Sequence, residues 1–212
     1  SGQEQQGTQG TAQAEGQQET GQVTGQQGTV RDDVIVVMGP TSEPEAGFDP
    51  AYGWGAGEHV HEPLIQSTLT VTTTDLKIGY DLATGMEASL TWTVTIRDDV
   101  SFTDGEKLTA GDVAFTYNTL RDTSSVNDFT MLKEAQAVND TTVEFHMNRP
   151  YSIWPYTMAI VGIVPEHAYG AGYGEHPVGS GRYMLKQWDK GQQVILEANP
   201  DYYGEAPIMK KV

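Results

Sequence analysis

Residues 91–96 show the clearest alternation of apolar and polar positions in the chain. Trp92, Val94 and Ile96 fall on one side, and the threonines between them fall on the other. A period of two is typical of a half-buried strand. Asp104-Gly105 follows and favours a turn, because aspartate and glycine tolerate the backbone angles of a reversal. This stretch therefore predicts a strand that ends in a turn.

The spacing becomes helical after the turn. Thr109 is a good N-cap residue, and Asp112 three residues later can complete a capping box. A carboxylate in the first turn also interacts favourably with the helix dipole. Val113, Tyr117 and Leu120 then lie on one face. We therefore expect a capped helix directly after the strand and turn.

A second alternating stretch runs from Thr141 to Met147. Its apolar residues share one face and its polar residues share the other, where we expect His146 to be solvated. This strand can pair with residues 91–97 in an antiparallel sheet whose apolar face is covered by helices.

Weaker patterns predict the remaining elements. They are a buried strand at Asp33–Met38, a strand or hairpin at Leu69–Lys77, helices at Phe129–Ala137 and Ser152–Met158, a short buried strand at Ile160–Val164, and a hairpin of Tyr183–Trp188 and Gln192–Ala198 around Asp189-Lys190-Gly191. Residues 1–30 consist almost entirely of Gln, Gly, Thr and Glu, so we expect a disordered linker there.

Composition and charge argue against several classes of function. The net charge of −17 over 212 residues repels phosphate groups and argues against a nucleic-acid partner. The chain has no cysteine, which excludes disulfides, thiolate metal sites and cysteine nucleophiles. No apolar run has the length of a transmembrane helix. Neither a catalytic serine motif nor a distinctive pair of carboxylates stands out, so we expect no enzyme activity and no cofactor.

The segment IRDDVSFTDGEKLTAGDVAFTYNTL, residues 96–120, resembles the signature of the family 5 extracellular solute-binding proteins. These are the receptors of ABC importers for peptides, nickel and related solutes. The matching residues are Arg97, Val100, Phe102, Asp104, Gly105, Leu108, Thr109, Ala110, Asp112, Val113, Phe115 and Thr116. Shorter matches extend over residues 33–212 at Glu43-Pro44, Phe48-Asp49-Pro50, His61-Glu62-Pro63-Leu64, Tyr80-Asp81-Leu82-Ala83, Pro177–Tyr183 and Asn199–Gly204. His61, Tyr80 and Arg182 replace the residues usual in the family.

The resemblance implies a mixed α/β fold of the type II periplasmic-binding-protein class, with a smaller inserted domain. It divides the chain into the linker at residues 1–30, the first part of lobe I at 31–67, an inserted α+β domain at 68–160, and the returning part of lobe I at 161–212. Family members are far longer, so the second lobe is expected outside this stretch.

The implied function is an extracytoplasmic receptor. It would capture a peptide or a small chelated solute, nickel chelates included, between two lobes and deliver it to ABC permease subunits. The alternative is an interaction or scaffold module of the cell surface with no small-molecule site of its own. Residues 1–30 resemble the tether of a bacterial lipoprotein, with an expression remnant as the alternative. Membrane contact is then expected only through a lipid anchor outside this sequence, for a protein of the cell surface or periplasm.

Expected solute contacts fall in three places. Tyr52, Trp54 and Gly55 lie in a glycine-rich loop after a buried strand, and in a lobed receptor such loops face the cleft. Their rings can stack on a solute, with loop packing as the equal alternative. By resemblance, Val161-Gly162 and Gly181-Arg182 supply further contacts. Some nickel receptors of the family place an arginine near residues 153–165, and its absence here weakens a nickel-chelate assignment.

His59 and His61 are a weak metal candidate. On a strand both imidazoles would share one face, and zinc or nickel accepts imidazole. No third ligand is nearby in the sequence, so packing of this segment is the favoured interpretation. The glycine-rich stretch Gly170–Gly174 lacks the strand-to-helix context of a phosphate-binding loop, which argues against a nucleotide site.

Overall fold

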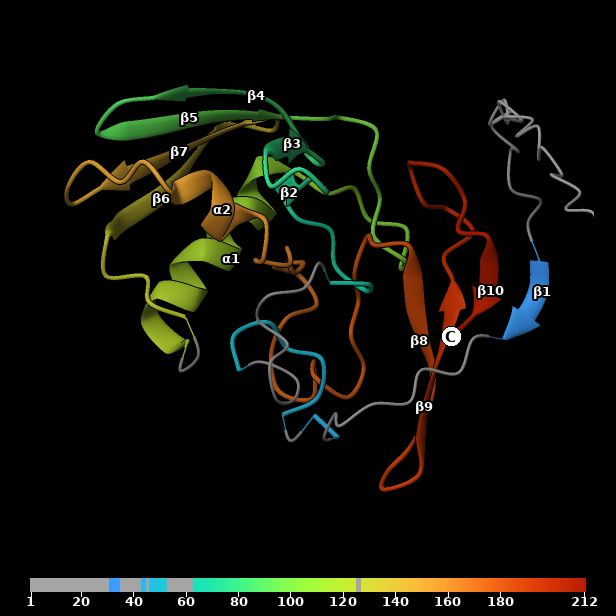
Figure 1. The fold of residues 1–212 in the computed structure, drawn as a ribbon. Helices are drawn as coiled ribbons and strands as arrows, with labels where there is room; N and C mark the ends of the chain where they lie inside the picture. The colour runs from blue at the N-terminus through green and yellow to red at the C-terminus, as the bar shows by residue number, and fades with distance from the viewer. Residues whose placement is uncertain (1–30, 35–42, 45, 53–62, 125–126) are drawn as a thin grey trace, which may run out of the picture.

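The computed structural model describes residues 31–34, 43–44, 46–52, 63–124 and 127–212. The expected linker at residues 1–30 therefore lies outside the described residues. The described residues form two four-stranded sheets and one two-stranded sheet, with two helices (Figure 1). No helix among them is both long and apolar enough to cross a lipid bilayer.

The first four-stranded sheet is antiparallel and has the strand order β4-β5-β7-β6. The strands are β4 (Ala83–Ala88), β5 (Thr91–Ile96), β6 (Leu132–Asn139) and β7 (Thr142–Met147). Helix α1 (Ala110–Thr123) covers one face of this sheet and contacts β6 and β7 (Figure 1). The predicted antiparallel pairing of the two alternating stretches is confirmed, with Trp92 opposite Phe145.

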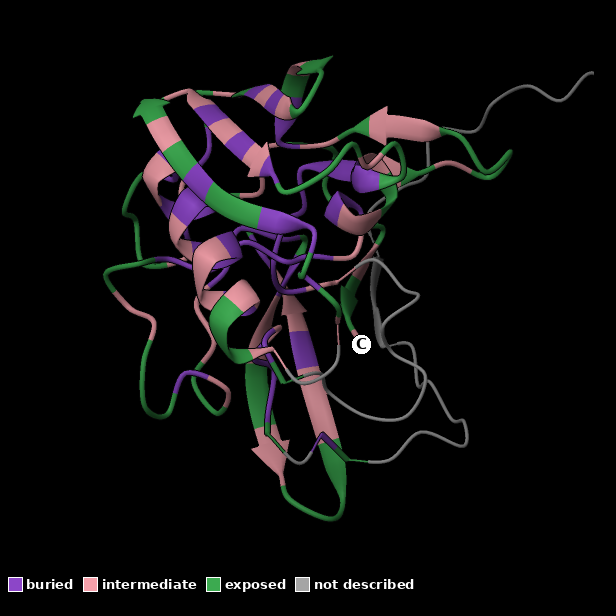
Figure 2. Cartoon of the chain, turned by 90° about the vertical axis from the view of Figure 1, so that its left-hand side faces the viewer, coloured by how far each residue is buried: buried purple, intermediate pink, exposed green. Residues whose placement is uncertain are grey.

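The alternation in β5 and β7 sorts their side chains between the core and the surface. The apolar residues of both strands are buried, whereas the polar residues between them are intermediate or exposed. Figure 2 shows these buried residues as alternating bands along the strands. Sequence periodicity therefore located both strands and the faces they bury.

Helix α1 begins with the predicted capping box. The Thr109 hydroxyl accepts a hydrogen bond of 3.2 Å from the Gly111 N–H, and Oδ2 of Asp112 accepts one of 2.9 Å from the Thr109 N–H. These bonds satisfy backbone groups that a helix start leaves without partners. The helix face that packs on the sheet contains Tyr117 and Leu120, which are both buried.

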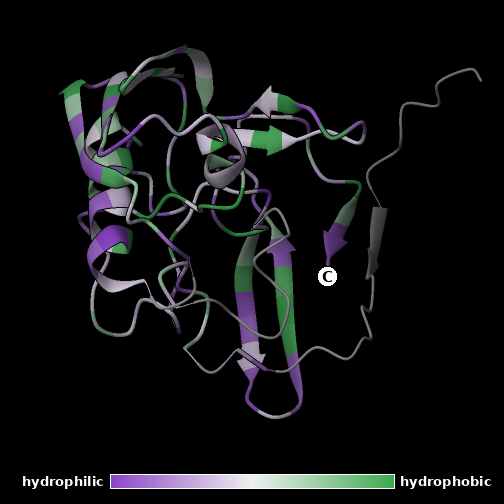
Figure 3. Ribbon diagram, turned by 60° about the vertical axis from the view of Figure 1, so that its left-hand side comes forward, coloured by the Kyte–Doolittle hydropathy of each residue, from purple (hydrophilic) through white to green (hydrophobic). Residues whose placement is uncertain are grey.

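The second four-stranded sheet has the order β1-β10-β9-β8. Its strands are β1 (Arg31–Val34), β8 (Tyr183–Asp189), β9 (Gln193–Ala198) and β10 (Met209–Lys211). β1 runs parallel to β10, so the first described residues lie beside the end of the chain (Figure 1). The predicted hairpin of β8 and β9 is confirmed, and Gly191 adopts a φ of 78° in its turn. Along this hairpin, hydrophobic stretches such as Val194–Leu196 are followed by hydrophilic ones (Figure 3). Of the strand predicted at Asp33–Met38, residues 35–38 lie outside the described residues.

A short hairpin and a second helix complete the described elements. They are β2 (Thr70–Thr72), β3 (Ile78–Tyr80) and α2 (Trp154–Met158). The hairpin confirms the strand or hairpin predicted at Leu69–Lys77, although its second strand begins after Lys77. Helix α2 confirms the helical segment predicted at Ser152–Met158. Strand β4 was not predicted, because its sequence ATGMEA alternates too weakly.

Two predicted elements are wrong. The helix expected at Phe129–Ala137 is mostly strand β6, which pairs along its length with β7. Its sequence LKEAQAVN is rich in helix formers, so tertiary pairing here outweighs local propensity. The segment expected to be a strand at Ile160–Val164 forms no strand, although residues 161–164 are buried, because its backbone N–H groups bond to separate loops and side chains. The Ile163 N–H donates to the Ser67 carbonyl, and the Val164 N–H donates to the Thr116 hydroxyl.

The main core lies between the first sheet and both helices. Phe145 has its ring centroid 4.7 Å from that of Tyr117 and 5.3 Å from that of Trp154. All three side chains are fully buried, and their edge-on geometry is favourable for aromatic rings. A smaller core joins the second sheet to segments from the first third of the chain and contains Phe48, Ile65, Tyr183 and Leu196.

Candidate functional site

The segment Leu64–Ser67 holds both backbone stretches that the sequence analysis assigned to solute contact. The Gly181 N–H donates a hydrogen bond of 2.9 Å to the carbonyl of Ile65. The Ile163 N–H donates one of 2.9 Å to the carbonyl of Ser67. The structure thus brings residues 161–163 and 179–183 against one short segment, although they are far apart in the sequence.

Two of the expected contact residues are glycines at close backbone approaches. A Cβ atom at Gly162 would lie 2.6 Å from Cβ of Gln66, and one at Gly181 would lie 2.4 Å from the carbonyl oxygen of Leu64. Both distances are shorter than ordinary van der Waals contacts, so packing within the chain requires glycine at both positions. Val161 is buried beside them, with 1% of its surface exposed.

Tyr52 lies in a turn that is tied to the same segment. Its N–H donates to the carbonyl of Asp49 at 3.1 Å, and Nε2 of Gln66 donates to the carbonyl of Phe48 at 2.9 Å. The Tyr52 side chain is 49% exposed, which leaves its ring free to meet an external molecule. Trp54 and Gly55, which were expected to act with Tyr52, lie outside the described residues.

Sequence reasoning missed the side chains that hold this turn. The Tyr169 hydroxyl donates to both carboxylate oxygens of Asp49, at 3.1 and 2.9 Å, across a separation of 120 positions. Nε2 of Gln66 lies 3.2 Å from the Tyr173 hydroxyl. Burial raises the pKa of Asp49, and its hydrogen bonds oppose that effect. The signal available in the sequence was the Phe48-Asp49-Pro50 match, but nothing local marks partners so far along the chain.

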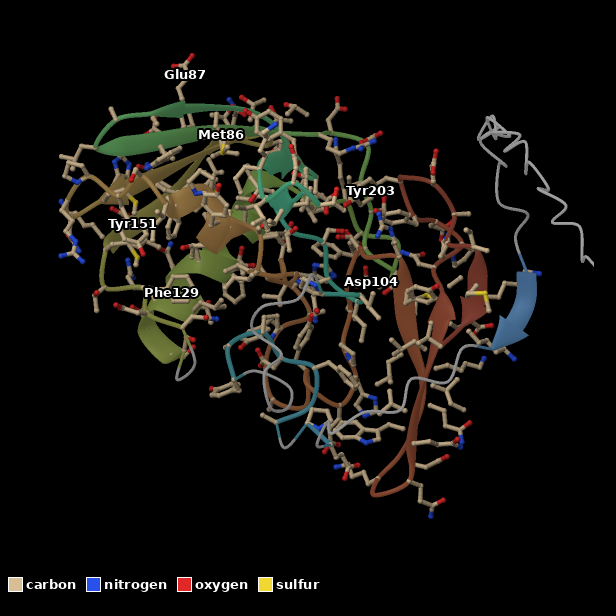
Figure 4. The ribbon with its side chains drawn as sticks, in the orientation of Figure 1. Met86, Glu87, Asp104, Phe129, Tyr151 and Tyr203 are labelled. Carbon is tan, nitrogen blue, oxygen red and sulfur yellow. The ribbon has the colours of Figure 1, made fainter. Side chains whose placement is uncertain are left out.

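Arg182 is exposed and belongs to a different cluster. Its guanidinium carbon lies 5.7 Å from the ring centroid of Tyr202. Beside it, Asp81 accepts a hydrogen bond from the Tyr203 hydroxyl, and Arg97 lies over the Tyr203 ring at 4.6 Å. Figure 4 shows Tyr203 between the loop that follows β5 and the second sheet. Burial raises the pKa of Asp81, against the opposing effects of the Tyr203 bond and of the two arginines.

The described part of the chain contains no group of three His, Cys, Asp or Glu side chains placed to hold a metal ion. His59 and His61 lie outside it. His146 is not simply solvated as expected, because Nδ1 lies 3.1 Å from the Thr91 hydroxyl and Nε2 lies 3.3 Å from the Glu144 carboxylate. A hollow of about 470 Å³ opens beside the end of β5. None of the expected contact residues lines it, and its lining residues are Thr84, Ile96, Arg97, Asp98, Asp99 and Thr141.

Comparison with known proteins identifies the family. The profile of the bacterial extracellular solute-binding proteins, family 5, matches residues 77–212. This match covers more than half of the chain, and the chain belongs to this family. The resemblance seen in residues 96–120 is thereby confirmed.

Relatives and solved structures agree with this assignment. Protein XP55 of Streptomyces lividans is 35% identical over an alignment of 190 residues, and the match covers 82% of this chain and 34% of that protein. NikZ from Campylobacter jejuni, solved in complex with Ni(L-His), matches with a TM-score of 0.69 and 27% identity over 77% of this chain and 36% of NikZ. The oligopeptide-binding protein AppA from Bacillus subtilis, solved with a nonapeptide, matches with a TM-score of 0.69 and 27% identity over 80% of this chain and 37% of AppA. These matches confirm the mixed α/β fold of the type II periplasmic-binding-protein class. The chain spans about a third of the length of these relatives.

Proposed function

We propose that this chain serves in an extracytoplasmic solute receptor of an ABC importer, with no catalytic activity of its own. Membership of the solute-binding family over residues 77–212 is the observation that carries the proposal. The proposed solute is a peptide or a small chelate, handed on to ABC permease subunits. The nonapeptide in AppA and the Ni(L-His) in NikZ support these two solute classes. We place the protein at the cell surface through a lipid anchor or in the periplasm, and the tether-like composition of residues 1–30 supports the anchor.

The proposed lobe I combines residues 31–67 with residues 161–212. The parallel pairing of β1 with β10 supports this division, as does the small core that packs Phe48 and Ile65 against Tyr183 and Leu196. Residues 68–160 form the proposed inserted domain. They contain β4, β5, β6, β7 and α1, which share the main core.

The proposed solute contacts are Tyr52, Trp54, Gly55, Val161, Gly162, Gly181 and Arg182. Two observations support these contacts. The segments that contain Tyr52, Val161-Gly162 and Gly181-Arg182 all bond to Leu64–Ser67, and the Tyr52 side chain is exposed. An exposed aromatic ring beside a rigid backbone wall can stack on a peptide bond or on a planar chelate. A second lobe would supply the facing wall, as hinge closure does in receptors of this kind.

Calorimetry on the full-length protein tests the function, with a nonapeptide and Ni(II)–L-histidine as separate probes. We expect one of them to bind with a dissociation constant of about 1 μM or tighter, equivalent to about 8 kcal/mol. Tyr52→Ala should weaken that binding about tenfold and leave the melting temperature nearly unchanged, because an exposed ring contributes little to folding. Tyr80→Ala is the matched control, since Tyr80 is a tyrosine of similar exposure on β3.

The outcomes separate the candidate functions. If neither probe binds, and a pool of shorter peptides also gives no heat, the protein acts as an interaction module and the receptor proposal is wrong. A sharp fall in melting temperature for Tyr52→Ala, with unchanged affinity per folded molecule, would show that Tyr52 packs the loop and does not contact solute.

A further inference from the structure

The loop from Pro165 to Gly174 connects the family signature to the turn that carries Tyr52. At its start, the Glu166 N–H donates to Oδ1 of Asp112 at 3.0 Å, and Nε2 of His167 lies 2.6 Å from Oδ2 of Asp104. At its end, the Gly174 carbonyl accepts a hydrogen bond of 2.8 Å from the Phe48 N–H. Figure 1 shows the turn at residues 46–52 beside this loop. The loop is therefore anchored at both ends.

A single buried carboxylate organises the turn itself. Asp49 is 6% exposed, and its Oδ1 accepts a hydrogen bond of 2.9 Å from the Ala51 N–H. The Asp49 carbonyl accepts the Tyr52 N–H at 3.1 Å. Both bonds fold the chain back onto Asp49, so the position of Asp49 determines the position of Tyr52.

Tyr169 supplies the long-range contact that fixes Asp49. Its hydroxyl donates to both oxygens of the carboxylate, at 3.1 and 2.9 Å. A hydrogen bond to a buried carboxylate is stronger than one between neutral groups. Burial and the neighbouring Asp49 raise the pKa of Tyr169, so the hydroxyl remains a donor at neutral pH.

The ring of Tyr169 is held independently of its hydroxyl. Its centroid lies 5.7 Å from that of Phe115 on α1 and 5.1 Å from that of Tyr173. Tyr173 in turn donates to the Val178 carbonyl at 2.8 Å. Removal of the hydroxyl alone therefore leaves the packing of the ring in place.

We propose that Tyr169 is a positioning residue for solute binding, which acts through Asp49 to hold the turn that presents Tyr52. This inference rests on the proposed function, in which Tyr52 contacts the solute. It also explains the role of Asp104 and Asp112 of the signature, because both hold the loop from which Tyr169 reaches Asp49. The signature carboxylates then act on solute binding indirectly, through this loop and Asp49.

Tyr169→Phe in the full-length protein tests the proposal, with Tyr156→Phe as the matched control. Tyr156 also loses a hydroxyl hydrogen bond in its variant, since it donates at 3.2 Å to the Leu76 carbonyl on a different part of the surface. The first measurement is amide hydrogen exchange at Ala51 and Tyr52, which needs no solute. We expect exchange there to speed up about tenfold or more in Tyr169→Phe, with α1 and the first sheet unchanged, because local opening becomes easier while global stability is kept. Tyr156→Phe should leave the exchange of both amides unchanged.

The second measurement is affinity for the nonapeptide and for Ni(II)–L-histidine. Tyr169→Phe should weaken the probe that the wild type binds by about tenfold, the cost of one lost hydrogen bond to a charged group. Unchanged exchange at Ala51 and Tyr52 would overturn the proposal, and so would faster exchange with unchanged affinity. If the wild type binds neither probe, the receptor function fails, and the exchange rates alone then decide whether Tyr169 holds the turn.

Discussion

Oδ1 of Asp112 accepts a hydrogen bond of 3.0 Å from the backbone N–H of Glu166, which lies 54 residues later in the chain. Its other oxygen, Oδ2, accepts the Thr109 N–H at 2.9 Å. One carboxylate therefore caps α1 and fastens the loop that follows Pro165. Asp112 is only 7% exposed, so water cannot readily replace it as the partner of either N–H.

Asp112→Asn should destabilise the protein, although the amide has nearly the shape of the carboxylate. The amide offers one acceptor oxygen in place of two, so one of the two N–H groups loses its partner. We expect a loss of about 1–2 kcal/mol in the free energy of unfolding, typical of a broken cap or an unpaired buried donor. Urea unfolding measures it. Asp122→Asn at the exposed end of α1 is the control and should cost less than about 0.5 kcal/mol. Equal losses in the two variants would contradict the double role of Asp112.

Sequence periodicity predicted the parts of the fold in which local pattern and burial agree. In β5 and β7 the alternation of apolar and polar side chains correctly predicts which face is buried. The capping box of α1 is likewise local, because Thr109 and Asp112 are three residues apart. Strand β6 was missed for the opposite reason. Its local composition favours a helix, and only its pairing with β7 makes it a strand.

The candidate site was less predictable, because its geometry depends on distant pairs. Nothing in the sequence near Asp49 indicates that Tyr169 will bond to its carboxylate. Gly162 and Gly181 were expected at the site through resemblance, and the structure adds the close backbone approach that requires them. The contact role of these residues stays a prediction, as does that of Tyr52, Trp54 and Arg182.

Trp92→Ala tests the assignment of the buried face of β5. Trp92 is 9% exposed and lies opposite Phe145 in the sheet. Its removal should cost about 3–5 kcal/mol, as for other large buried aromatic residues, because the cavity cannot fully collapse. Leu90→Ala is the control, since Leu90 is 53% exposed in the turn just before β5. A loss below about 1 kcal/mol for Trp92→Ala in urea unfolding would show that the side chain does not belong to the core.

The partly buried carboxylate of Asp81 should make stability depend on pH. Burial raises its folded pKa above the ordinary value of about 4. Its stabilising contribution is therefore fully present below the unfolded pKa and is lost as the pH rises through the folded pKa. In Asp81→Asn the neutral amide cannot ionise, and its oxygen can still accept the Tyr203 hydroxyl.

Urea unfolding between about pH 4 and about pH 7 measures this effect. We expect the stability of wild type relative to Asp81→Asn to fall as the pH rises. Tyr203→Phe should raise the pKa of Asp81 further, because it removes a hydrogen bond that favours the ionised form. A wild-type profile parallel to that of Asp81→Asn would show that ionisation of Asp81 does not affect folding.

The pair of His167 and Asp104 should respond to pH in the same direction and for a different reason. Nε2 of His167 lies 2.6 Å from Oδ2 of Asp104, and both side chains are partly exposed. The bond to Asp104 raises the pKa of His167, with smaller contributions from Asp112 and Glu106. Because the folded pKa exceeds the unfolded value of about 6.5, the pair stabilises the fold fully below about pH 6.5. This contribution is lost as the pH rises through the folded pKa.

A proton NMR titration of the His167 ring measures the shift directly. In Asp104→Asn the pKa of His167 should fall toward its ordinary value, because the amide carries no charge to favour the imidazolium. Asp128→Asn removes a carboxylate just before β6 and should leave the His167 titration unchanged. High salt should shrink the wild-type shift, since an exposed ion pair is screened. An unchanged pKa of His167 in Asp104→Asn would show that the charge of Asp104 does not hold the start of this loop. The bond from Glu166 to Asp112 would then be the contact that holds it.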